Sequence, residues 1–187
     1  KAGIPGEAEF TGKGVSYCAT CDGACFRNKT TAVVGGGDVA VEDAIYLARM
    51  CEKVYLIHRR DEFRAAKSLV NKAKNTENIE LVLDSTVERI SGEAKVSSIE
   101  VKNKITGNTD EFAVDGVFFA VGMQPVTAFV DKSVQMNEAG YIAAGEDCAT
   151  NVPGVYAAGD IRTKQLRQII TAAADGANAV ASVEKYI

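Results

Sequence analysis

The feature that most constrains the fold is a glycine-rich turn, Gly35–Gly37, between a β-branched run and a helix-forming run. Thr30–Val34 is a short β-branched stretch that predicts a buried strand, and Asp38–Met50 carries apolar residues at helical spacing. Val54–Ile57 predicts a second buried strand. A strand, a helix and a strand joined so closely form a β-α-β unit, which requires a parallel sheet and a right-handed crossover. The sequence therefore predicts an α/β protein.

The segments that follow have two different patterns. Phe63–Lys74 predicts a helix and Ile79–Leu83 a strand of the same α/β kind. Three later stretches alternate apolar and polar residues, which predicts an antiparallel meander inserted into the α/β unit. They are Thr86–Ile90, Val96–Asn103 and Asp110–Val114, with Gly107 and Asn108 between the last two. The apolar Gly116–Gly122 then predicts a return to the buried parallel sheet.

After Pro125 the pattern loosens. Gly154–Asp160 is an apolar run that predicts a strand, and the Ala-rich Gln168–Tyr186 predicts a long helix. We place the main domain boundary near residue 123.

The glycine turn matches the dinucleotide-binding fingerprint with Ala in its third place. Gly35 permits a tight turn, Gly37 lets the backbone approach a pyrophosphate, and Ala40 lets helix and strand pack closely. The helix N-terminus offers unpaired N–H groups to the anion. The motif alone is weak, but a strand before it and a helix after it favour nucleotide binding over a purely structural turn. The candidate contacts are Gly35, Gly36, Gly37, Asp38, Val39 and Ala40.

Basic residues at the end of the second strand indicate which coenzyme binds. NAD sites place an Asp or Glu about 20 residues after the glycines, whereas this chain has His58, Arg59 and Arg60 there, with Arg64 following. Guanidinium groups bind a 2′-phosphate that a carboxylate would repel, so NADP(H) is favoured over NAD(H). The alternative is a solvated basic helix start. His58 is interpreted as a neighbour of the 2′-phosphate or as a structural residue, not as a general base.

Cys18-Ala-Thr-Cys21 has three candidate meanings. As a redox dithiol the pair closes a small disulfide ring whose thiolate can open a partner's disulfide. As half of a zinc site it needs two more ligands, of which Cys25 offers one. As packing residues the two cysteines have no chemistry. Asp22 favours the redox reading, because an adjacent carboxyl can give or take a proton as the thiol changes state.

Composition excludes several classes of function. The 187 residues carry a net charge of −4, which does not favour nucleic-acid binding. No stretch approaches the roughly 20 apolar residues of a membrane helix, and no signal-peptide pattern is present, so a cytoplasmic protein is expected. Cys51 and Cys148 are isolated and are interpreted as buried packing thiols. We predict no metal site.

Together these motifs resemble bacterial low-molecular-weight thioredoxin reductases over essentially the whole chain. The redox segment is Gly14–Gly23, and the coenzyme site is Gly35–Ala40 with the basic residues described above. Gly154–Asp160 with Arg167 and Gln168 resembles the C-terminal part of the family's FAD site. The resemblance implies a homodimer in which NADPH reduces FAD, FAD reduces the Cys18–Cys21 disulfide, and the dithiol reduces thioredoxin. It also implies that the coenzyme domain swivels relative to the FAD domain.

The resemblance also assigns roles. Cys21 would lie nearest the flavin, Cys18 would attack the thioredoxin disulfide, and Asp22 would be the acid/base. The residues assigned to the flavin side are Gly122, Gly159, Asp160, Arg167, Gln168 and Ile169. The expected fold is a three-layer Rossmann-like domain with an inserted meander, plus a partial second, FAD-binding Rossmann-like domain. The expected parts are residues 1–9 as a connection, 10–122 as the coenzyme and dithiol domain, and 123–187 as the partial FAD domain.

Departures from the family leave alternatives open. The family has an N-terminal FAD segment with its own glycine motif, which this sequence lacks, so we expect a colourless fragment that binds FAD poorly or not at all. The rival reading is the reductase component of alkyl hydroperoxide reductase, which generally prefers NADH. Two further alternatives are an inactive NADPH-binding fragment of the parent flavoenzyme and a non-enzymatic metal- or nucleotide-binding module.

Overall fold

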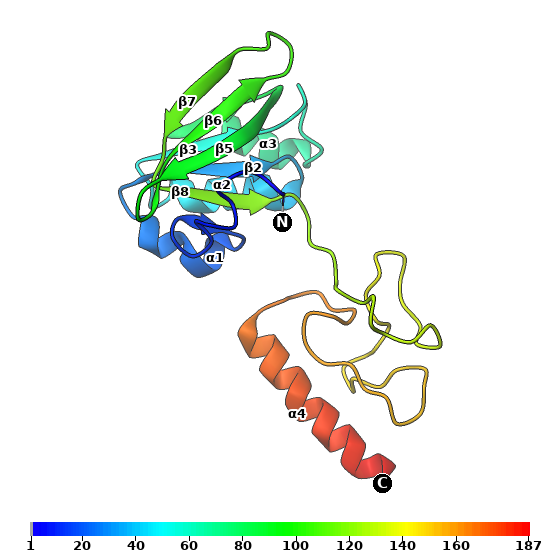
Figure 1. Cartoon of the computed structure of the whole chain (residues 1–187). Coiled ribbons are helices and arrows are strands. Elements are labelled where there is room, and N and C mark those ends of the chain that lie inside the picture. Colours follow the sequence, from blue (N-terminus) through cyan, green and yellow to red (C-terminus); the bar gives the residue numbers. More distant parts are fainter. Residues whose placement is uncertain (1) are drawn as a thin grey trace. The chain divides into compact units, whose positions relative to one another are not determined.

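The computed structural model describes residues 2–187. The chain divides into two compact units, the first ending at Val121 and the second spanning Gly122–Ile187 (Figure 1). They are called unit 1 and unit 2 below. No helix within residues 2–187 combines the length and the apolar character needed to cross a bilayer.

Unit 1 is built on a parallel sheet of five strands in the order β1-β8-β2-β3-β4. The strands are β1 Val15–Ser16, β2 Thr30–Gly35, β3 Lys53–Ile57, β4 Ile79–Val82 and β8 Gly116–Ala120. In the centre of the sheet, Val33 of β2 is in register with Leu56 of β3 and Phe118 of β8. The two-residue β1 was not predicted, because it is too short to show a period and is defined by its pairing with β8.

Two further layers cover the two faces of this sheet (Figure 1). Side chains of Val33 and Phe118 pack into one apolar cluster with Leu47 of helix α2, whereas Val117 and Ile99 belong to a second cluster with the antiparallel strands. The helices are α2 Asp38–Ala48 and α3 Lys67–Lys74, and the antiparallel strands are β5 Ser85–Gly92, β6 Val96–Asn103 and β7 Thr109–Ala113. The predicted α/β fold with an inserted antiparallel meander is therefore confirmed.

Helix α3 begins at Lys67, so the prediction that this helix starts at Phe63 is wrong. The backbone amides of Arg64 and Ala66 are used elsewhere: Arg64 N donates to the Gly36 carbonyl at 2.8 Å, and Ala66 N donates to Asp38 Oδ1 at 2.8 Å. These contacts hold the segment before α3 against the glycine loop. Helical spacing in the sequence carries no information about such tertiary hydrogen bonds.

Unit 2 contains one long helix, α4 Ile169–Tyr186, and a small apolar cluster that includes Val134, Ile142 and Ala157. The predicted strand Gly154–Asp160 is wrong: this segment makes only an isolated bridge between Tyr156 and Ala149. A strand needs a continuous partner to satisfy its backbone groups, and within residues 122–187 the structure offers bridges in place of a ladder.

Asp43 on α2 provides a test of how this helix packs in unit 1. Burial, followed by the charge of neighbouring Glu42, raises the pKa of Asp43 to about 6. Because an unfolded aspartate titrates near about 3.9, this group adds stability below about pH 4, and the contribution is lost as the pH rises through the folded value. We expect Asp43→Asn to raise the free energy of unfolding by about 1–2 kcal/mol at about pH 7 and to have less effect at about pH 5. Urea unfolding followed by circular dichroism measures both values.

The exposed Glu42 is the control for this prediction. Glu42→Gln removes only the second cause of the raised pKa and should give a smaller gain. A difference between Asp43→Asn and the unchanged chain that stays constant over this pH range would contradict the assignment.

Candidate functional site

The glycine loop lies at the carboxyl end of β2, between β3 on one side and β8 on the other. The chain leaves β2 toward β3 and β4, while β8 returns on the opposite side, so the strand order changes direction at β2. In parallel α/β sheets, ligands bind in the crevice at such a switch point. The fold thus places the predicted fingerprint where a nucleotide site is expected.

Within the loop, the three positions of the fingerprint have different surroundings. A Cβ added to Gly35 would lie 2.5 Å from the Ala120 carbonyl oxygen and 2.7 Å from the Cβ of Ala40, which is fully buried. Gly37 is the N-cap of α2, and a Cβ added there would meet no atom within 4 Å. Gly35 and Ala40 therefore serve packing, whereas Gly37 leaves open space beside the first amides of the helix.

This contrast predicts that Gly37→Ala keeps the fold and weakens dinucleotide binding. Gly37 has extended backbone angles that Ala adopts without strain, so thermal unfolding should not fall. A methyl group in the open space would keep a pyrophosphate from the α2 amides and raise the Kd for NADP+ about tenfold, the effect of losing about one charged hydrogen bond. Calorimetric titration measures the Kd. Unchanged affinity in a folded variant would show that no pyrophosphate lies there.

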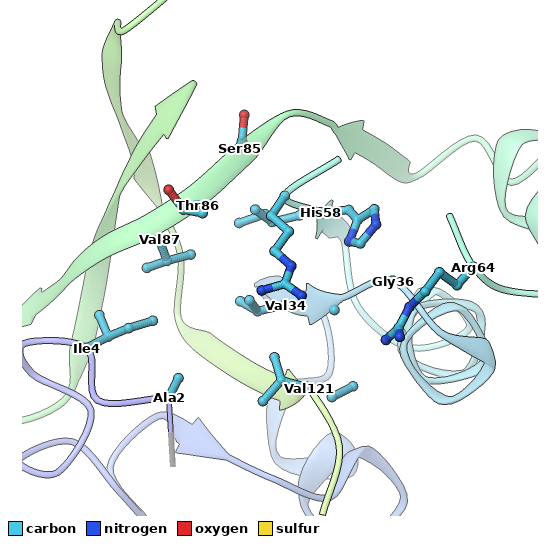
Figure 2. A pocket seen from close by; sticks show the side chains of 14 residues that line it. Ala2, Ile4, Val34, Gly36, His58, Arg64, Ser85, Thr86, Val87 and Val121 are labelled. Carbon is cyan, nitrogen blue, oxygen red and sulfur yellow. The ribbon is translucent and has the colours of Figure 1, made fainter. Parts of the chain in front are cut away.

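A cavity of about 350 Å³ opens beside the loop (Figure 2). Arg59 and Arg64 line it together with Gly35 and Gly36, whereas Arg60 is not among its lining residues. The bond from Arg64 N to the Gly36 carbonyl ties one guanidinium-bearing residue directly to the glycine loop. Ser85 and Thr86, at the start of β5, also line the cavity. Sequence reasoning missed them because the meander, far along the chain, folds back over the crevice.

His58 is buried under the glycine loop. Its ring stacks on Phe63 with centroids 5.3 Å apart, and a Cβ on Gly36 would collide with the imidazole. Burial lowers the pKa of His58, a hydrogen bond with the Glu62 backbone opposes this, and nearby arginines including Arg59 lower it further. Nε2 has no hydrogen-bond partner within residues 2–187. A neutral, packed imidazole at the cavity wall agrees with the structural reading of this residue.

Cys18 and Cys21 form a disulfide, with their Cα atoms 5.3 Å apart. Cys18 is the N-cap of the short helix α1 Ala19–Asp22, and its Sγ accepts a hydrogen bond from Cys21 N at 3.2 Å. Asp22 Oδ2 accepts a hydrogen bond of 2.6 Å from Ser16 Oγ. Cys21 is exposed and Cys18 is half-buried. A reducible bond with a carboxylate one residue away can exchange both electrons and protons with a partner.

The other three cysteines lie outside this pair. Cys51 and Cys148 are buried, which confirms the packing prediction, and burial raises the pKa of both thiols and makes them poor nucleophiles. Cys25 is exposed, on the 3₁₀ helix η1 Gly23–Phe26. Within residues 2–187, no three His, Cys, Asp or Glu side chains are grouped so that they could hold a metal ion.

The residues assigned to the flavin side lie in unit 2. Asp160 and Arg167 line a shared surface pocket with Tyr141, and the Arg167 guanidinium lies 4.0 Å from the centre of the Tyr141 ring. Arg167 Nε also donates to the Asp160 carbonyl at 3.4 Å. Gln168 is the N-cap of α4 and Ile169 is its first residue, 90% exposed. Gly122, the first residue of unit 2, has a positive φ of 101°.

A buried charge cluster supports the loop that carries Asp160. Asp175 on α4 accepts bonds from Arg162 at 2.8 and 2.6 Å, from Lys164 Nζ at 2.7 Å, and from the Gly159 amide at 2.8 Å. Arg162 holds the pKa of Asp175 far below its usual range. Sequence reasoning missed this cluster, since its members are joined only by the folding of α4 against the preceding loop.

A model of the family described as pyridine nucleotide-disulphide oxidoreductase matches residues 1–176. The chain belongs to the pyridine nucleotide-disulphide oxidoreductase family. This membership agrees with a dinucleotide loop and a reducible disulfide in one compact unit.

The chain is similar to several proteins named thioredoxin reductase. The thioredoxin reductase of Treponema pallidum is 46% identical over 187 residues, which cover all of this chain and 61% of that protein. That of Bacillus subtilis is 46% identical over 188 residues, covering all of this chain and 60% of the relative. The crystal structure of thioredoxin reductase from Streptococcus pyogenes matches with a TM-score of 0.93 and 45% identity, over all of this chain and 61% of that one. The chain thus spans about three fifths of these relatives, and the resemblance noted in the sequence is confirmed.

Proposed function

We propose that this chain carries the coenzyme site and the redox disulfide of an NADPH-dependent thioredoxin-disulfide reductase. The observation that carries the proposal is the Cys18–Cys21 disulfide in the same compact unit as an arginine-lined dinucleotide crevice. Similarity to proteins named thioredoxin reductase supports thioredoxin as the partner.

The crevice residues fit a dinucleotide that carries a 2′-phosphate. Open space at Gly37 leaves room for a pyrophosphate beside the first amides of α2, which have no side-chain cap at the Gly37 position. Arg59 and Arg64 offer planar guanidinium groups to the additional phosphate. When bound, NADPH would supply a hydride, and FAD, held in part by the flavin-side residues of unit 2, would supply the resulting two electrons to the disulfide.

The dithiol chemistry belongs to this chain's own residues. The Cys18–Cys21 bond takes up two electrons and two protons and opens to two thiols. The Cys18 thiolate then attacks the thioredoxin disulfide and forms a mixed disulfide. Cys21 displaces the thioredoxin thiolate, which restores the Cys18–Cys21 bond and leaves thioredoxin as a dithiol. Asp22, held by Ser16, exchanges the proton at the cysteine pair.

Unit 2 supplies part of the flavin site in this proposal. Asp160 is exposed and lines the same pocket as Arg167, so its carboxylate is free to accept hydrogen bonds from ribityl hydroxyls. The full set of proposed flavin-side residues is Gly122, Gly159, Asp160, Arg167, Gln168 and Ile169. A homodimer, which rests on the resemblance, completes the proposal, together with the three domain parts and the cytoplasmic location expected from the sequence.

The test follows NADPH consumption by this chain joined to the segment of the Bacillus subtilis relative that it does not cover, so that the FAD site is complete. We expect continuous NADPH oxidation, beyond the first reduction of the enzyme itself, only after oxidised thioredoxin is added, with two thiols appearing on thioredoxin for each further NADPH consumed. Cys18→Ser and Cys21→Ser should both abolish turnover. Reduction of a peroxidase in place of thioredoxin, with NADH preferred, would favour the alkyl hydroperoxide reductase alternative.

A further inference from the structure

Glu7 is a buried carboxylate that the proposed chemistry does not use. It is 2% exposed and accepts four hydrogen bonds: from the amides of Ala2, Gly3 and Ile4 at 2.9, 2.7 and 3.3 Å, and from Tyr17 Oη at 2.6 Å. Burial alone would raise the pKa of Glu7, but the bonds from Tyr17 and the three amides outweigh it and lower the pKa. A buried carboxylate surrounded by donors fixes the segment that supplies them.

The segment held by Glu7 forms one wall of the dinucleotide crevice. Ala2 and Ile4 line the same cavity as Arg59 and Arg64. Figure 2 shows Ala2 and Ile4 on the side of the cavity away from Arg64. If the 2′-phosphate binds at the arginines, the nicotinamide half of the coenzyme extends toward the wall that contains Ala2 and Ile4.

The fourth bond connects this wall to the redox segment. Tyr17 immediately precedes Cys18, and its ring stacks on Phe119 with centroids 6.0 Å apart. Phe119 belongs to β8, the strand that leads to Ala120 and Val121 at the cavity. Glu7 thus contacts, through one carboxylate, both the cavity wall and the residue beside the disulfide.

We propose that Glu7 is a positioning residue for the nicotinamide half of the coenzyme, acting through the backbone of residues 2–4. The inference rests on the proposed function, since it needs a nicotinamide dinucleotide in this crevice. All four partners of Glu7 are donors, so a glutamine side chain, with one acceptor oxygen, cannot satisfy them. Loss of these bonds frees the wall but leaves the glycine loop and the arginines in place.

The test compares two probes on the same chain by calorimetric titration. NADP+ spans the whole crevice, whereas adenosine 2′,5′-bisphosphate carries the 2′-phosphate without the nicotinamide half. We expect Glu7→Gln to raise the Kd for NADP+ about tenfold, because the wall is no longer held in place for the nicotinamide half, and to leave the Kd for the bisphosphate unchanged. The exposed Glu9 gives the matched control, Glu9→Gln, which removes the same charge and should change neither Kd.

Equal NADP+ affinity in Glu7→Gln and in the unchanged chain would overturn the inference, as would an equal loss for both probes in a folded variant. If Glu7→Gln does not fold, Tyr17→Phe removes one of the four donors, and an unchanged ratio of the two Kd values in that variant would overturn the inference as well. Failure of the proposed function gives a different result, in which the unchanged chain itself binds NADP+ no more tightly than NAD+.

Discussion

Exchanging Arg59 and Arg64 together for Ala should lower the affinity for NADP+ about a hundredfold and leave the affinity for NAD+ nearly unchanged, since two charge-assisted contacts to the 2′-phosphate are lost. Both residues line the cavity, and Arg64 is tied to the glycine loop through its backbone amide. NAD+ has no 2′-phosphate, so it does not use these contacts. Calorimetric titration with each coenzyme measures the change.

Arg60 provides the matched control for this pair. It is exposed, adjacent to Arg59 and of the same charge, but it does not line the cavity. Arg60→Ala should therefore lower NADP+ affinity only through screened, longer-range attraction, by about threefold or less. An equal fall in NADP+ and NAD+ affinity in the double variant would mean that the arginines hold the crevice open and do not recognise the extra phosphate.

Asp175→Asn should destabilise unit 2 by about 3–5 kcal/mol, because removal of one partner leaves buried cations uncompensated. The Arg162 and Lys164 side chains are 9% and 7% exposed and both contact this carboxylate. The substitution also weakens the hold on the Gly159 amide, next to Asp160. Protease cleavage within residues 122–187 should become much faster, which mass spectrometry of the fragments measures.

The control for this prediction is Glu184→Gln, an exposed acidic position on the same helix. It should leave the cleavage rate unchanged. Because the pKa of Asp175 is lowered, its contribution to the stability of unit 2 is present above the ordinary aspartate pKa of about 3.9. This contribution is lost as the pH falls below that value. Wild-type cleavage kinetics in Asp175→Asn would show that Arg162 and Lys164 are stabilised by other groups.

The periodicity of apolar residues was sufficient to predict most helices and strands of unit 1. Alternation identified the meander. The β-branched run Thr30–Val34 and the apolar run Gly116–Gly122 identified two central strands, because strands buried on both faces of a sheet are rich in such residues. The wrong predictions concern segments whose structure depends on tertiary contacts. The start of α3 is delayed by hydrogen bonds to the glycine loop, and the expected strand Gly154–Asp160 lacks a continuous partner within the described part of unit 2.

The same division applies to the candidate site. The glycine loop, the arginines and the cysteine pair could be identified because each has a local spacing with a physical reason. Glu7, Ser16 and Asp175 could not, since their partners depend on how distant segments fold together. Arg59 and Arg60 are adjacent and carry the same charge, so the sequence predicts the same role for both. In the structure, Arg59 lines the cavity and Arg60 does not.

The most direct test of the central claim measures the redox state of one peptide. This chain, joined to the segment of the Bacillus subtilis relative that it does not cover and loaded with FAD, is mixed without oxygen with NADPH or with the same concentration of NADH. Free thiols are then labelled and located by mass spectrometry. We expect NADPH to convert the Cys18–Cys21 disulfide to two labelled thiols, while NADH leaves most of it oxidised. Equal labelling by the two coenzymes, or a disulfide that NADPH leaves intact, would contradict an NADP(H) crevice that delivers electrons to this cysteine pair.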